Sequence, residues 1–160
     1  MISEKFHIVP VLNDGDLNSA ANVDCDSINM ANIHKVLFIV GLQTLGGANP
    51  DVAPYGGAAN GTCTAVVPFQ YAYGGAAQGT TDCDVLAAWT AATALVAISH
   101  ANKDNFMLLI EVDAKAMAAA GYSWLTLRFA DTLTGATGNV QVHAICEMRY
   151  AKGQQASVLA

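Results

Sequence analysis

Hydrophobic and polar residues alternate with a period of two in several stretches of the chain, a pattern typical of half-buried β-strands. The clearest cases follow one another at residues 106–112, 122–129 and 138–150. Weaker alternation and continuous apolar runs predict further strands at residues 5–12, 34–45, 64–73, 85–89 and 93–99. Many short strands at close spacing predict an all-β fold, a β-sandwich with a jelly-roll-like topology.

Prolines and an apolar run add detail to three of these strands. Val36–Val40 is continuously apolar, which predicts a strand covered on both faces. Pro10 has no N–H for a strand ladder and indicates an edge strand or an extended arm, and Pro68 indicates an edge or a bulge.

One short helix is expected between two strands. Asp113 is placed to cap residues 114–120, and Gly121 is placed to end them at the C′ position. Turns are expected at residues 13–16, 100–105 and 131–139, where Gly, Asn, Asp and Thr gather.

The loops and the N-terminus are the candidate contact regions. Residues 46–61 are predicted to form a long loop rich in Gly and Ala, and residues 74–84 a second one. The chain divides into an N-terminal arm with an edge strand (1–30), a β-sandwich domain (31–152) and a tail (153–160). The arm has two interpretations: it reaches a neighbouring subunit, or its strand joins its own sheet. If the arm reaches a neighbour, deletion of the residues up to Met30 should leave a folded domain that no longer binds its partner.

The composition is unusually poor in charge, with 53% hydrophobic and 12% charged residues. Abundant Ala and Gly explain part of this, and a surface covered by other subunits is the interpretation we favour. A net charge of −6 argues against nucleic-acid binding. No apolar run reaches the 18 or so residues of a membrane span, and the N-terminus lacks a leader pattern, so we expect synthesis and retention in a cytoplasm.

Candidate chemistry is sparse, and we expect no enzyme activity and no cofactor. The four cysteines lack zinc-ligand spacing and are expected to be free thiols. The pairs Asp24 with Asp26 and Asp82 with Asp84 leave a cation site open, although turn and cap roles are commoner. Glu111 and Asp113 share a strand face, but Asp113 is the expected helix cap, which argues against a glycosidase pair.

Three segments carry a family resemblance. These are Phe106–Ala114 followed by an Ala-rich turn to Gly121 and Tyr122, then Trp124–Leu127, then the 138–150 strand ending in Met148, Arg149 and Tyr150. Together with Ser27–Met30 and the strand after it, this order resembles small structural proteins of tailed bacteriophages.

The resemblance implies a capsid decoration or cement protein, or a minor head or tail component. The implied partners are the major capsid protein and further copies of this chain, as a trimer or dimer, with no nucleic acid and no membrane. The implied location is the virion surface, after assembly in the host cytoplasm.

Candidate protein-contact residues come from the arm, the first loop and the aromatic strand: Phe6, Ile8, Pro50, Pro54, Tyr55, Tyr71 and Tyr73. The row formed by Phe69, Tyr71 and Tyr73 is more typical of core packing than of a stacking platform. A carbohydrate-binding β-sandwich that uses Tyr55, Tyr71, Tyr73 and Trp89 is the alternative from another class.

Overall fold

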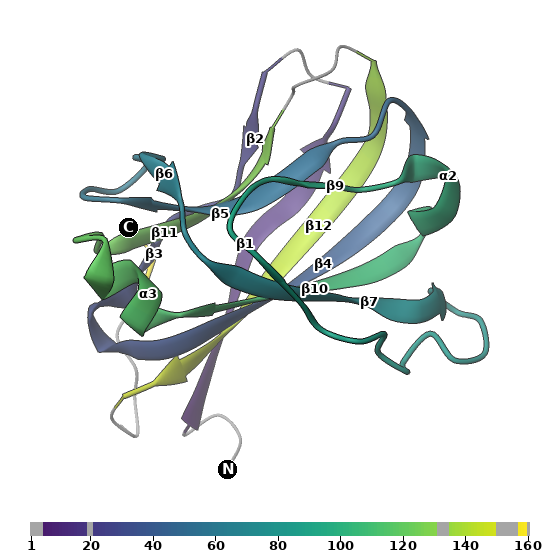
Figure 1. Cartoon of the computed structure of the whole chain (residues 1–160). Helices are drawn as coiled ribbons and strands as arrows, with labels where there is room; N and C mark the ends of the chain where they lie inside the picture. Colours follow the sequence, from purple (N-terminus) through teal and green to yellow (C-terminus); the bar gives the residue numbers. More distant parts are fainter. Residues whose placement is uncertain (1–4, 19–20, 131–134, 150–156, 160) are drawn as a thin grey trace.

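The computed structural model describes residues 5–18, 21–130, 135–149 and 157–159, and it is a sandwich of two antiparallel β-sheets (Figure 1). Sheet A has the strand order β1-β12-β4-β10-β7-β8. Sheet B has the order β2-β11-β5-β6, and β3 also pairs with β11 and β9 with β5. The predicted all-β sandwich is confirmed, whereas the jelly-roll connectivity stays a prediction.

Sheet A contains β1 (Phe6–Asp16), β12 (Ala136–Met148), β4 (Ile33–Gly47), β10 (Phe106–Asp113), β7 (Phe69–Ala77) and β8 (Thr90–Ala92). Sheet B contains β11 (Trp124–Ala130), β5 (Asp51–Gly57), β2 (Val23–Asp24), β3 (Ile28–Asn29), β6 (Ala65–Val66) and β9 (Val96–Ala97). The short helices are η1 (Met30–Asn32), α2 (His100–Lys103) and α3 (Ala114–Ala119). The turn predicted at 100–105 is therefore mostly helical. The strand expected at 85–89 lies later, at β8, and the strand expected at 93–99 is confirmed in its place as the shorter β9.

The core lies between the sheets and is built from alternate residues of the long strands. Phe38 on β4, Ile110 on β10 and Val142 on β12 are fully buried. Their neighbours on the outer face, such as Leu37 and Ile39, are only half-buried. The prediction that β4 is covered on both faces is therefore wrong, because no second layer lies over its outer face.

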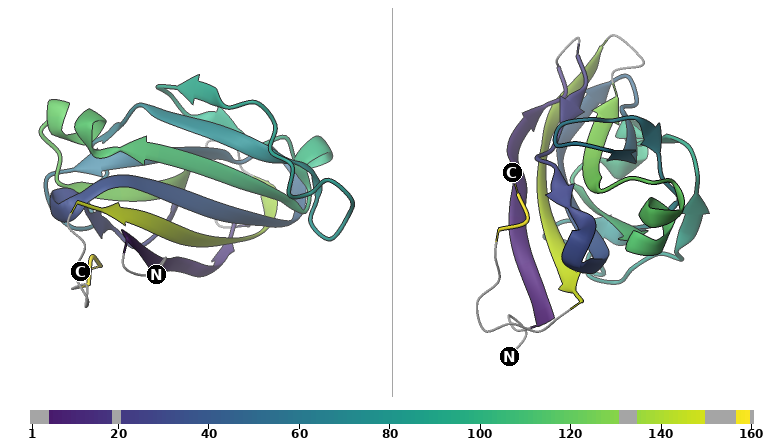
Figure 2. Two further views of the ribbon diagram at one scale, coloured as in Figure 1. Left: turned by 90° about the horizontal axis from the view of Figure 1, so that it is seen from below. Right: turned by 90° about the vertical axis from the view of Figure 1, so that its left-hand side faces the viewer.

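The N-terminal segment belongs to the sandwich. β1 pairs with β12 from Phe6 opposite Glu147 to Asp16 opposite Asn139, with register shifts after Pro10 and Leu12. Of the two interpretations, the structure has the strand on its own sheet, at an edge (Figure 2). The turn predicted at 13–16 is wrong, because these residues continue β1 through the register shifts.

The first thirty residues also supply part of the core, and the buried ones are Val9, Val11, Leu17, Cys25, Ile28 and Met30. Removing them would expose the inner faces of both sheets to water. We therefore expect that deletion through Met30 unfolds the domain, contrary to the expectation for a separable arm.

The long loop predicted at residues 46–61 is wrong, since β5 occupies residues 51–57 in the interior of sheet B, between β11 and β6. Pro54 is tolerated there because its carbonyl, which accepts from Val67 N–H at 3.1 Å, faces the short β6 side of the strand. The glycines reflect close contacts, since a Cβ at Gly57 would lie 2.0 Å from the Thr62 carbonyl oxygen.

Helix α3 follows its prediction closely. The Asp113 carboxylate accepts from Lys115 N–H at 2.8 Å and so caps the helix. Gly121 has a φ of +75°, and the N–H of Tyr122 reaches the carbonyl of Met117 at 3.1 Å, which completes a Schellman ending.

The remaining predictions near the chain end and at Pro68 are settled in part. The predicted 64–73 strand is divided at Pro68, because β6 belongs to sheet B and β7 to sheet A. Residues 131–134 and most of the 153–160 tail lie outside the described residues. Within the described part of the tail, Leu159 bridges to Ile28. β12 begins at Ala136, so the last residues of the turn predicted at 131–139 are strand.

Candidate functional site

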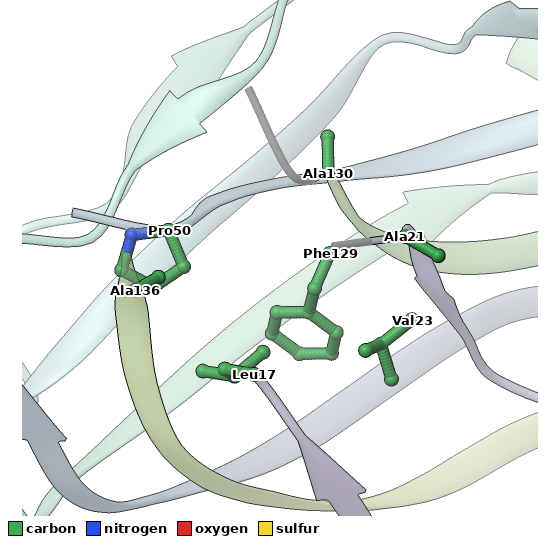
Figure 3. Close-up of a pocket in the computed structure, with 7 residues that line it drawn as sticks. All are labelled: Leu17, Ala21, Val23, Pro50, Phe129, Ala130 and Ala136. Atoms are coloured by element: carbon green, nitrogen blue, oxygen red, sulfur yellow. The ribbon is translucent and has the colours of Figure 1, made fainter. Parts of the chain in front are cut away.

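The contact residues predicted from the first loop are mostly interior. Pro50 and Pro54 are buried and Tyr55 is half-buried. Figure 3 shows Pro50 lining a small crevice with Leu17, Phe129 and four other apolar residues. Its volume of about 10 Å³ is at the lower limit for one water molecule, so the crevice is a packing defect rather than a ligand site.

The aromatic row is part of the protein's packing, as its pattern indicated. Tyr71 and Tyr73 pack against the core, with ring centroids 6.0 Å apart in an edge-to-face arrangement. The Lys103 ammonium lies 4.6 Å from the Tyr73 ring centroid and 4.5 Å from that of Phe106. Burial raises the pKa of the Tyr73 hydroxyl to about 12. These rings therefore do not form a free platform.

The two candidates on β1 differ in exposure. Phe6 is half-buried, whereas Ile8 is 60% exposed on the outer face of sheet A, opposite Ile145 of β12. Ile8 is thus available to a partner, while Phe6 is partly engaged with its own sheet.

Of the five large exposed apolar side chains among the described residues, four lie between residues 85 and 95, where sequence reasoning had singled out Trp89 alone. We name these four, Val85, Leu86, Trp89 and Leu95, the crossover patch: the first three precede β8 at the edge of sheet A, and Leu95 lies between β8 and β9, where the chain crosses to sheet B (Figure 1). Their exposed fractions are 56%, 39%, 41% and 38%. Residues 85–99 contain no charged side chain, and this was the sequence signal that could have found the patch.

A groove hollows the outer face of sheet A beside this patch. Its volume is about 330 Å³, and the strand side chains Ile39, Met107 and His143 line it together with Cys83 and Asp84 of the β7–β8 loop. No hydrogen bond or ion pair joins Cys83, Asp84 and His143 to one another in the described part of the chain. The groove therefore places a thiol, an imidazole and a carboxylate near one another without the contacts that nucleophilic catalysis requires.

Three of the carboxylates singled out in the sequence, Asp24, Glu111 and Asp113, have structural roles. Asp24 receives two hydrogen bonds from Arg128, at 2.6 and 2.8 Å, and the guanidinium lies 5.0 Å from the Tyr55 ring centroid. The ion pair with Asp24 raises the pKa of Arg128. Glu111 pairs with Lys35 at 2.9 Å, and Asp113 caps α3. No group of three or more His, Cys, Asp or Glu side chains among the described residues could hold a metal, so the cation alternative loses its support.

All four cysteines are free thiols, and they form two groups that differ in burial. Cys25 and Cys146 are buried, and burial raises the pKa of Cys146 to about 12 and that of Cys25 further. Cys63 and Cys83 are half-buried. The pKa of Cys63 is raised, mainly by burial and to a smaller extent by the negative charge of Asp24. A raised pKa keeps a thiol protonated and so a poor nucleophile.

Comparisons of the chain with protein-family models, with curated proteins and with solved structures found no match. Among the helices that the structure describes, none is long and apolar enough to cross a membrane.

Proposed function

We propose that this chain is a virion structural protein that works by binding other proteins, through the crossover patch, and not by catalysis. The crossover patch is the observation that carries the proposal, because large half-exposed apolar side chains with no charge between them mark interaction surfaces. Burying their remaining exposed surface would contribute on the order of 5 kcal/mol to association. The low overall charge, 12% of residues, fits a surface that is partly covered in an assembly.

The more specific role is decoration or cementing of a tailed-phage capsid shell. The resemblance of residues 106–150 to small structural proteins of tailed bacteriophages supports it, and the partner is then the major capsid protein. A minor head or tail component would use the same patch and is the alternative within this class. Either role places the chain in the virion, after assembly in the host cytoplasm.

A carbohydrate-binding module has less support. Of the four rings considered for a platform, Tyr71 and Tyr73 pack against the core and Arg128 covers a face of Tyr55. Trp89 is the exposed one, at 41%. Sugar platforms depend on open aromatic faces, and only the Trp89 ring meets that condition among these four.

The test compares two surfaces of the same chain. Trp89→Ser with Leu95→Ser removes the centre of the crossover patch, and Ile8→Ser removes an equally apolar and more exposed side chain of β1. Because all three positions are exposed, the variants should fold, which circular dichroism checks. Binding is followed by co-sedimentation with shells assembled from the major capsid protein of the same genome.

We expect the patch variant to lose at least about tenfold in shell affinity and Ile8→Ser to bind as the unaltered chain does. Loss of shell binding in Ile8→Ser alone would show that β1, and not the crossover patch, makes the contact. Absence of shell binding by the unaltered chain would refute the capsid role. A change in Trp89 fluorescence on adding sugars would instead favour the carbohydrate alternative.

A further inference from the structure

Basic side chains gather at one end of the sandwich. His34, Lys115 and Arg149 line a pocket of about 590 Å³ with Asp113, Ala114 and Ala118. The Arg149 Nε donates to the Ile33 carbonyl at 3.1 Å, which fixes the guanidinium at the pocket and leaves its other nitrogens available. Asp113 is already engaged as the cap of α3 through Lys115 N–H.

Three other described cations have their own partners. Lys35 is paired with Glu111 and Arg128 with Asp24, and the Lys103 ammonium lies over two rings. Among the residues that the structure describes, no carboxylate forms an ion pair with Lys115 or Arg149. Two positive charges and the single carboxylate of Asp113 therefore share one pocket, which is net positive in a chain of net charge −6, and an anionic group is the ligand that suits it.

An acidic loop projects from the opposite end, between β7 and β8 (Figures 1 and 2). Asp82 and Asp84 are exposed there, and within the described chain their carboxylates make no hydrogen bond or ion pair. Backbone bonds brace the loop: Val85 N–H donates to the Asp82 carbonyl at 3.1 Å and Gly75 N–H to the Val85 carbonyl at 2.6 Å. The two carboxylates are thus presented on a fixed support, which lowers the entropy cost of binding.

We propose that the Asp82–Asp84 loop of one copy docks into the Lys115–Arg149 pocket of a second copy. Opposite charges at opposite ends of the sandwich make this a head-to-tail contact, and such contacts close into rings when the rotation between copies allows. A ring of three gives the trimer expected above. The contact is made by charged residues and the proposed shell contact by the apolar crossover patch, so self-association and shell binding are tested separately.

The experiment uses two charge-reversal variants of the full chain. The loop variant carries Asp82→Lys and Asp84→Lys, and the pocket variant carries Lys115→Glu and Arg149→Glu. Each variant alone brings like charges together at every contact. A mixture of the two restores opposite charges at both kinds of contact. The unaltered loop of the pocket variant meets the unaltered pocket of the loop variant, and the reversed loop meets the reversed pocket.

We expect the unaltered chain to sediment as an oligomer in analytical ultracentrifugation, each variant as a monomer, and the equimolar mixture as an oligomer in which the two variants alternate. Asp26→Lys, an exposed charge change away from the loop, should still form the oligomer. Thermal unfolding shows whether each variant is folded.

Three outcomes would overturn the proposal: a monomeric unaltered chain, oligomers that survive both reversals, or a mixture that stays monomeric. Should a charge-reversal pair unfold the chain, Asp84→Asn and Lys115→Gln replace it, with a loss of about tenfold or more in association expected from each. Because no shell is present, these results are independent of the capsid role.

Discussion

A buried hydroxyl pair tests whether residues 1–30 are structurally part of the sandwich. The Ser27 and Thr126 side-chain oxygens are 2.7 Å apart, and both residues are buried. Ser27 Oγ also accepts from Gly61 N–H at 3.0 Å. Ser27 therefore joins the N-terminal segment both to β11 and to the turn after β5.

The expected energies follow from counting these bonds at about 1 kcal/mol each. Ser27→Ala loses both bonds and should cost about 2 kcal/mol of unfolding free energy, with up to about 1 more for the buried Thr126 hydroxyl left without Ser27. Thr126→Val loses one bond and should cost about 1 kcal/mol. The double variant loses the same two bonds as Ser27→Ala, so its cost should fall about 1 kcal/mol short of the sum.

Urea unfolding at equilibrium measures all three values, and each kcal/mol should shift the melting temperature by about 2–4 °C. A cost for Ser27→Ala below about 0.3 kcal/mol would refute the bonded arrangement. It would also restore the interpretation of the first thirty residues as a separate arm. Strictly additive costs in the double variant would show that the two hydroxyls do not interact.

Three further predictions concern the core, the thiols and alkaline pH. Phe38→Ala, at a fully buried position, should cost about 3–5 kcal/mol in urea unfolding; a cost below 1 would contradict its place in the core. In the native chain at pH 8, a thiol reagent such as DTNB should modify Cys63 and Cys83 well before Cys25 and Cys146, as peptide mass spectrometry would show. Tyr73 has a folded pKa of about 12, above the value of about 10 in unfolded chains, so the unfolded state loses its proton first. Stability contributed by Tyr73 is therefore complete below pH 10 and falls between pH 10 and 12, an effect that Tyr73→Phe should reduce.

Periodicity predicted the elements whose side chains alternate cleanly. β10, β11 and β12 show this best. One face of each strand contributes Ile110, Leu127 or Val142 to the core, while the other face is more exposed to solvent. The α3 helix was predicted from its two ends, since Asp113 and Gly121 act through local backbone geometry. Local chemistry of this kind is visible in a single sequence.

β5 was not predicted because its residue types are determined by contacts with parts of the chain that are distant in sequence. Gly56 and Gly57 are needed where Tyr122 and Thr62 approach the strand, and Pro54 is allowed only by the direction of its carbonyl. The crossover patch was not predicted as a contact surface for a related reason. Alanine-rich residues 85–99 give weak strand signals, and their exposure depends on how two sheets meet.

The pairing of β1 with β12 has a consequence for how the chain is made. β12 lies between β1 and β4, and its register places Glu147 opposite Phe6, so β1 has no partner in sheet A until β12 has been synthesised. At about 5–20 residues per second, that wait is on the order of 10–30 s. During it, Val9 and Val11 stay open to water on the ribosome-bound chain. We expect the first strand to be among the last to be secured, after β12 has left the ribosome.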